Sequence, residues 1–172
     1  TASSAHGNVR TLHTTIFSHG HIDHVSGLGV FEREAEENGW GRPRVIAHEG
    51  VPKRFARYAL TAGYNQAINT RQFGVEVPWP TEYRQPDETY RESLDVEVGG
   101  ERFELHHARG ETDDYTWTWV PGRKVLCPGD LIIWCLPNAG NPQKVQRYAA
   151  DWIVALREMS ELGAEALLGQ GD

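Results

Sequence analysis

The segment FSHGHIDHVSGLG, residues 17–29, places three histidines and an aspartate within six positions: His19, His21, Asp23 and His24. The whole chain has eight histidines, so three in one turn indicate a shared task. His19 and His21, two residues apart at the end of an expected strand, project to the same side and can bind one ion. Asp23 and His24 are offset from that pair and can serve a second ion. Because imidazole nitrogen and carboxylate oxygen are zinc ligands, the segment predicts a metal site; the alternative is a polar loop of hydrogen-bonded histidines.

Distant partners for these ligands occur in two later segments. LHHARGETDD offers His107 at the end of a strand, and LCPGDL offers Asp130 in another loop that follows a strand. Gly110 and Gly129 lie beside them and let the backbone approach a crowded site. Since all three segments follow expected strands, they can converge at one edge of a sheet. One of His106 and His107 must face away, and His107 is preferred because it has the right spacing to Gly110 and Thr112. The alternative for Asp130 is a simple turn former.

Extended and helical segments alternate along the chain. Apolar and β-branched patterns predict strands at 9–17, 44–48, 93–108, 115–120, 124–130 and within 164–172. Helical periodicity predicts helices at 27–40, 51–74 (with Gly63 as a candidate break) and 141–163 (with Asn141 as N-cap). Gly99-Gly100 indicates a hairpin, and the proline-rich residues 74–91 are expected to form a loop long enough to act as a lid. The mixture predicts an α/β or α+β class with layered packing.

Composition excludes several classes of function. The 172 residues suit a single domain, expected over 1–172. The net charge is −7 and basic residues do not cluster, so neither nucleic acid nor a membrane surface is an expected partner; a small-molecule substrate is. No apolar run approaches the roughly 20 residues of a membrane span. Cys127 and Cys135 form no CxxC pair or disulfide framework; as two free thiols they leave the compartment open, with the cytoplasm favoured.

In this order, HxHxDH, a strand-end histidine followed by glycine and threonine, and a glycine-aspartate pair resemble the metallo-β-lactamase superfamily. The resemblance implies an αββα sandwich with a binuclear site at one edge, with zinc expected and manganese or iron also suited to such ligands. It implies that His19, His21 and His107 bind the first metal and that Asp23 and His24 bind the second. It also implies that the Asp130 carboxylate bridges both metals.

A closer likeness covers about Glu101 to Glu165. The segments HHARGETDD, PNAGNPQKVQRY and ALREMSELGAE resemble the alkyl-sulfatase-like branch, which includes dodecyl-sulfate hydrolases. That branch, as the resemblance implies, has glutamates among its ligands, whereas this chain carries Asp130 at the bridging position. Asn138 and Arg147 follow this aspartate and are predicted to bind a substrate anion, Arg147 from the first turns of a helix.

Two departures from the family pattern concern the chain ends. The family fold opens with a β-rich segment of several dozen residues, whereas only 18 residues precede His19 here. The family's last metal ligand is a histidine in a loop resembling PGHG, whereas this chain has Gln170. We therefore expect a partial domain, or a member with an impaired second site. A truncated domain would expose strand edges, which predicts a homodimer.

The chemistry predicted for such a site is hydrolysis. Two ions about 3.5–4 Å apart can hold a hydroxide and polarise a substrate oxygen, and they lower the pKa of bound water towards ~7. Asp23 is predicted to act as a catalytic residue that orients the nucleophile or accepts its proton. Two hypotheses follow: a metal-dependent hydrolase of an alkyl sulfate, lactone or thioester, or a non-catalytic family member with a mononuclear or structural metal.

Overall fold

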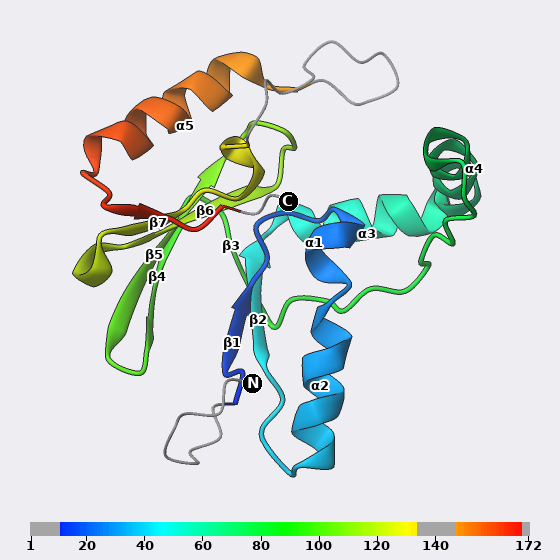
Figure 1. Cartoon of the computed structure of the whole chain (residues 1–172), viewed down its shortest axis with the longest axis horizontal. Helices are drawn as coiled ribbons and strands as arrows, with labels where there is room; N and C mark the ends of the chain where they lie inside the picture. Colours follow the sequence, from blue (N-terminus) through cyan, green and yellow to red (C-terminus); the bar gives the residue numbers. More distant parts are fainter. Residues whose placement is uncertain (1–10, 134–146, 170–172) are drawn as a thin grey trace.

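Two β-sheets pack face to face, and helices cover their outer faces (Figure 1). The structure is a computed structural model that describes residues 11–133 and 147–169. In the order of the layers, α5 lies over the five-stranded sheet, the three-stranded sheet follows, and α1, α2 and α3 lie beyond it. This is the αββα sandwich implied by the resemblance, so the predicted fold class is confirmed.

The first half of the chain forms the smaller sheet and four helices. Its three parallel strands, in the spatial order β1-β2-β3, are β1 (Thr14–Ile16), β2 (Arg44–His48) and β3 (Glu88–Tyr90). Its helices are α1 (Ile22–Val25), α2 (Leu28–Glu37), α3 (Gly50–Leu60) and α4 (Ala62–Phe73). The strand β3 lies inside the segment 74–91 that was predicted as loop. It has three residues and, among the described residues, pairs only with β2, so its conformation depends on a partner far away in the sequence.

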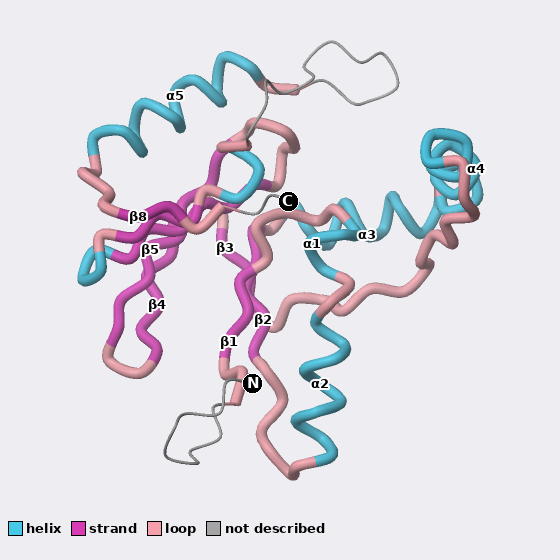
Figure 2. Tube along the Cα trace, in the orientation of Figure 1, coloured by secondary structure: helices cyan, strands magenta, loops and turns pink. Residues whose placement is uncertain are grey.

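The second half forms the larger sheet, in the order β4-β5-β6-β7-β8 (Figure 2). Its strands are β4 (Ser93–Val98), β5 (Glu101–Ala108), β6 (Tyr115–Val120), β7 (Val125–Cys127) and β8 (Ala166–Leu167). Neighbours run antiparallel except β7 and β8, which are parallel. The hairpin predicted at Gly99 and Gly100 is confirmed, and both residues have positive φ, 61° and 79°, which glycine adopts without steric cost.

Helix boundaries differ from the sequence expectation at two points. The predicted helix 51–74 is interrupted, but at Thr61, which ends α3 and precedes α4, rather than at Gly63. The helix α5 runs from Ala149 to Glu161. The predicted N-cap Asn141 lies outside the described residues, while Arg147 precedes the helix instead of occupying its first turns.

Three hydrophobic clusters hold the layers together. One joins α5 to the larger sheet through large side chains that include Trp117, Leu126, Trp152 and Met159. A second packs α1 to α3 on the smaller sheet through Phe17, Val45, Val51 and Phe55. The third lies between the sheets and contains Ile46, Tyr90, Val96 and Leu105. Four of the five residues of β2 are buried, as expected for a parallel strand covered on both faces.

The two sheets also join through polar contacts at one end of the sandwich. The Thr116 N–H donates to the carbonyl of Ser18 at 2.6 Å, and the Tyr90 hydroxyl donates to Thr116 Oγ1 at 2.7 Å. These contacts bring the segment after β1 against the start of β6. The histidine-rich segment therefore lies beside the loop that joins β5 to β6.

Two features of the described residues bear on cellular context. In 11–133 and 147–169, no helix has the length and apolar character needed to cross a bilayer. Cys127 is a half-buried free thiol, and burial raises its pKa. Cys135 lies outside the described residues.

Candidate metal centre

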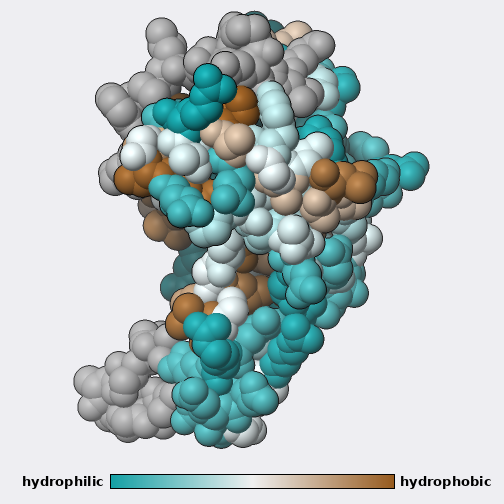
Figure 3. All heavy atoms as spheres, turned by 90° about the vertical axis from the view of Figure 1, so that its right-hand side faces the viewer, coloured by the Kyte–Doolittle hydropathy of each residue, from teal (hydrophilic) through white to brown (hydrophobic). Residues whose placement is uncertain are grey.

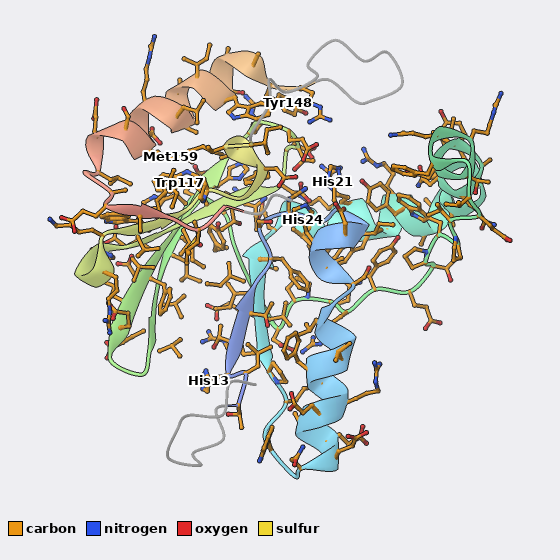
Figure 4. All side chains as sticks on the ribbon, in the orientation of Figure 1. His13, His21, His24, Trp117, Tyr148 and Met159 are labelled. Carbon is orange, nitrogen blue, oxygen red and sulfur yellow. The ribbon has the colours of Figure 1, made fainter. Side chains whose placement is uncertain are left out.

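Three loops meet at the same end of the sandwich. They are the segment after β1, residues 109–114 between β5 and β6, and the turn after β7 that holds Asp130. Figure 4 shows His21 and His24 together at this end, near α1, whereas His13 lies at the opposite end of β1. The predicted convergence of three strand-end segments is thus what the fold produces.

The first group of ligand-type side chains contains His19, His21 and Glu111. The His19 Nε2 atom lies 2.8 Å from His21 Nδ1, and Glu111 Oε2 lies 3.3 Å from the former and 3.4 Å from the latter. Arg147 donates to the other carboxylate oxygen, Oε1, at 2.6 Å. The buried Oε2 atom makes no hydrogen bond to any described residue, and it faces the two rings.

The protonation states in this group fit a cation. Burial, together with the nearby His21 and His24, lowers the pKa of His19 to about 4 although Glu111 acts in the opposite direction. Burial alone would raise the pKa of Glu111, but the nearby His19 and His21 rings hold it well below its usual range. At neutral pH His19 is therefore a neutral imidazole with one nitrogen able to coordinate, and Glu111 is a carboxylate. Two imidazoles and a carboxylate form a donor set typical of zinc sites.

A second group shares His19 with the first and adds His24 and Asp130. The His24 Nε2 atom lies 3.2 Å from Asp130 Oδ2 and 3.5 Å from Asp23 Oδ2. Asp23 is 75% exposed and can therefore move towards an ion or towards substrate. Because the two groups have a residue in common, their centres lie side by side.

Tyr115 links the two groups. Its ring stacks on His19, with centroids 4.8 Å apart, and its hydroxyl accepts a hydrogen bond from the Asp130 N–H. Gly129 has φ of +54°, and a Cβ there would lie 2.1 Å from the Tyr115 hydroxyl oxygen. A Cβ on Gly110 would lie 2.3 Å from a Leu131 methyl carbon. Both glycines permit the close backbone approach predicted for them.

The structure places His107 outside both groups of described residues. Its ring stacks on His48 at 3.7 Å with an angle of 4° between the planes, and its Nδ1 atom lies 2.9 Å from the Tyr115 carbonyl oxygen. His107 belongs to β5, whereas Glu111 lies in the loop beyond it and reaches His19. The sequence analysis did not select Glu111 as a ligand. The likeness to a branch with glutamate ligands was the signal that could have identified it.

Of the two residues predicted to bind a substrate anion, the structure describes only Arg147. Asn138 lies outside the described residues, as does Gln170. Arg147 forms an ion pair with Glu111, so its guanidinium contacts the first group and is already paired with a carboxylate.

A cavity of about 510 Å³ opens beside the two groups. His21, Asp23, Glu111 and Asp130 line one part of it. Apolar and aromatic side chains from α3, α4 and the following loop line another, including Tyr58, Tyr64, Ile68, Phe73, Val77 and Trp79. The side of the molecule that carries α4 presents separate hydrophobic patches among hydrophilic residues (Figure 3).

Three solved structures show what this fold is similar to. The secondary alkylsulfatase Pisa1 from a Pseudomonas species is 20% identical with a TM-score of 0.73, and the match covers 94% of this chain and 29% of Pisa1. A metallo-beta-lactamase from Pontibacter korlensis is 19% identical with a TM-score of 0.55, and the match covers 91% of this chain and 60% of that protein. The protein TTHA1623 in a di-iron-bound form is 17% identical with a TM-score of 0.59, and the match covers 90% of this chain and 67% of TTHA1623.

At these identities the structural likeness shows a shared fold, and the chain spans less than a third of the length of the alkylsulfatase. No curated protein sequence matches it. The model of the metallo-beta-lactamase superfamily, however, matches residues 2–171. Since that match spans nearly the whole sequence, the chain belongs to the metallo-beta-lactamase superfamily.

Proposed function

We propose that this protein is a metal-dependent hydrolase with a two-ion centre that acts on a small ester-type molecule. The observation that carries the proposal is the convergence of two ligand groups, centred on His19, beside one cavity. Membership of a superfamily composed mostly of hydrolases supports the reaction class.

In this proposal, three side chains hold each ion. The first ion takes His19, His21 and Glu111, and the second takes Asp23, His24 and Asp130. Glu111 thus replaces His107 in the predicted ligand set, because its carboxylate lies within 3.4 Å of both ring nitrogens. When bound, two divalent cations would polarise a substrate oxygen and lower the pKa of water towards ~7. Zinc suits these ligands, and the di-iron form of one fold neighbour keeps iron a candidate.

The protein's own groups would orient the reaction. Asp23 is exposed and lies against His24 at 3.5 Å, so it can turn to accept a proton from the nucleophile. Arg147 fixes Oε1 of Glu111 and thereby keeps Oε2 aimed at the histidines. The Tyr115 hydroxyl accepts a hydrogen bond from the Asp130 N–H and thereby keeps the Asp130 loop in place.

The cavity favours an anionic ester that also carries an apolar group. Arg57 lines the cavity, is exposed, and has no carboxylate within ion-pair distance among the described residues; its guanidinium lies 5.4 Å from the Tyr58 ring centroid. Ile68, Phe73 and Val77 provide apolar surface nearby. An alkyl sulfate has both features, and the fold likeness to an alkylsulfatase agrees with it. A lactone or thioester remains the alternative ester class.

A second candidate function is that of a non-catalytic member with one metal ion. It is favoured by the unequal preorganisation of the two groups. His19 and Glu111 are fully or largely buried, whereas Asp23, which is assigned to the second ion, is 75% exposed. In this reading only His19, His21 and Glu111 retain an ion.

A substrate panel tests the main proposal. The full chain loaded with zinc is assayed on sulfate, lactone, thioester and phosphodiester substrates, next to the variant His19→Ala/His21→Ala. Hydrolysis of one class by the wild type, abolished in the double variant, is expected. His13→Ala is the matched control, because this histidine lies at the far end of β1. Equal rates in all three proteins would contradict the proposal, as would a panel on which the zinc-loaded wild type shows no hydrolysis.

A further inference from the structure

A buried ion pair lies directly behind the histidine turn. Asp114 is fully buried and Arg54, from α3, is 8% exposed. The Arg54 Nε donates to Asp114 Oδ2 at 2.7 Å, and its Nη2 donates to Asp113. Neither Arg54 nor Asp114 belongs to a ligand group of the described residues.

The same carboxylate oxygen holds the backbone between two metal ligands. Asp114 Oδ2 accepts a hydrogen bond from the Gly20 N–H at 3.1 Å, and Gly20 lies between His19 and His21. Asp114 also follows Glu111 by three residues in one short loop. One side chain therefore ties together the two segments that supply the first ligand group.

The pair is enclosed by glycine backbone on two sides. A Cβ on Gly20 would lie 2.9 Å from Arg54 Cδ and 3.0 Å from Asp114 Oδ2. A Cβ on Gly50, at the start of α3, would lie 2.8 Å from Asp114 Cβ. These distances are shorter than normal carbon contacts, so only glycine fits and Asp114 has little freedom to move.

Charge balance explains why both members are needed. A buried carboxylate is unfavourable unless a cation and hydrogen bonds compensate for lost hydration. Arg54 supplies the cation and the Gly20 N–H supplies a further hydrogen bond. Beside Arg54, the pKa of Asp114 stays below its usual value although burial alone would raise it. The carboxylate is thus ionised and fixed without any help from a metal.

We propose that Arg54 and Asp114 are positioning residues that hold the His19–Gly20–His21 turn and the Glu111 loop in ligand geometry before a cation binds. This inference rests on the metal centre of the proposed function. Arg54 also lines the cavity, but its Nε and Nη2 are occupied by Asp114 and Asp113. It therefore acts through the ligands instead of through the substrate.

Metal affinity of the chelator-stripped full chain tests this inference. Zinc is titrated calorimetrically into the wild type and into Asp114→Asn, which keeps the shape of the side chain and removes its charge. The variant should bind the tighter ion about 10- to 100-fold more weakly, the usual cost of losing a partner that orients metal ligands. The absorption spectrum of the cobalt-loaded protein should change too, because the ligand geometry relaxes.

Asp87→Asn is the matched control. Asp87 Oδ2 also accepts a backbone N–H, from Val45 at 2.8 Å, and an arginine, Arg84 at 2.7 Å, but it lies outside both ligand groups. Its loss should lower the thermal midpoint while zinc affinity and the cobalt spectrum stay at wild-type values. Equal losses of affinity in the Asp87 and Asp114 variants would overturn the positioning role.

Gly50→Ala covers the case in which Asp114→Asn does not fold. The added methyl group presses on Asp114 from α3 and changes no charge, so zinc affinity should again fall. Wild-type affinity in a folded Gly50→Ala or Asp114→Asn protein would overturn the inference. So would a higher KM for anionic esters at unchanged zinc affinity in Arg54→Lys, since that result assigns Arg54 to the substrate. A wild type that binds no zinc would contradict the proposed function itself and the inference with it.

Discussion

The ring of Tyr115 stacks on His19 with centroids 4.8 Å apart, while its hydroxyl accepts the N–H of Asp130. One side chain from the larger sheet thus contacts a candidate ligand on the β1 loop and a candidate ligand on the β7 loop. Both the burial of Tyr115 and the Asp130 carboxylate raise the pKa of its hydroxyl well above the usual range, so the group stays neutral.

Removing this hydroxyl should weaken the second ion selectively. Tyr115→Phe leaves the Asp130 N–H without its acceptor, at a cost of about 1–3 kcal/mol for a buried donor. We expect the weaker zinc equivalent in a calorimetric titration to lose about 10-fold or more in affinity, while the tighter one changes less. Tyr90→Phe is the control, because its hydroxyl bonds Thr116 between the sheets. A Tyr115→Phe titration identical to wild type would show that Asp130 is oriented by other contacts.

Replacing Glu111 and replacing His107 should have opposite effects on the metal content of the protein. Glu111→Gln should remove the first ion, because it replaces the carboxylate that lies within 3.4 Å of His19 and His21. His107→Ala should keep that ion, because His107 packs on His48 instead. Plasma emission on both purified variants measures the difference. The reverse result would restore the ligand set that the sequence alone predicts.

The buried histidine should make the metal-free protein sensitive to acid. The pKa of His19 falls from 6.5 to about 4 on burial. Between these values the unfolded chain binds a proton at His19 and the folded chain does not, so protons favour unfolding. Stability should therefore rise with pH from about 4 to 6.5 and then lose this dependence. Urea unfolding across that range should show a smaller slope for His19→Asn than for wild type, with His13→Asn as a control for histidine number. An unchanged slope in His19→Asn would assign the acid sensitivity elsewhere.

Variants of the two arginines beside the metal centre, Arg57 and Arg147, should change different kinetic constants. Arg57 is exposed in the cavity, so Arg57→Ala should raise KM about 10-fold for an anionic ester and leave a neutral ester unchanged. Arg147 is paired with Glu111, so Arg147→Ala should lower kcat for both esters by loosening the first metal. Equal KM effects of Arg57→Ala on the two esters would remove it from anion recognition.

Local sequence signals predicted much of the fold. The run RVIAH has an apolar centre with two β-branched residues, Val45 and Ile46, and its predicted bounds are those of β2. Gly99 and Gly100 mark the hairpin because the turn needs positive φ. The strand β3 was missed because its three residues become a strand only by pairing with β2, a contact that no local pattern encodes.

The candidate site was predictable where ligands are close in sequence. His19, His21 and His24 could be selected by spacing, and the structure brings them together. The partner from the β5–β6 loop was not selected, although the predicted strand ends at 108 as β5 does. Spacing does not reveal which side chain near a strand end reaches His19: His107 stays in the sheet, and Glu111 reaches His19 from the loop. The ion pair of Arg54 with Asp114 joins residues 60 positions apart, and a sequence pattern does not identify such a pair.

The number of ions bound per chain tests the central claim most directly. The full chain, stripped by chelator and dialysed against excess zinc, is measured by plasma emission together with Asp130→Asn. Two ions per wild-type chain, and fewer in the variant, are the predicted result, because Asp130 lies 3.2 Å from His24 and is assigned to the second ion in the proposed function. A wild-type chain that binds one ion, with no change in Asp130→Asn, would contradict the two-ion centre and favour the mononuclear alternative.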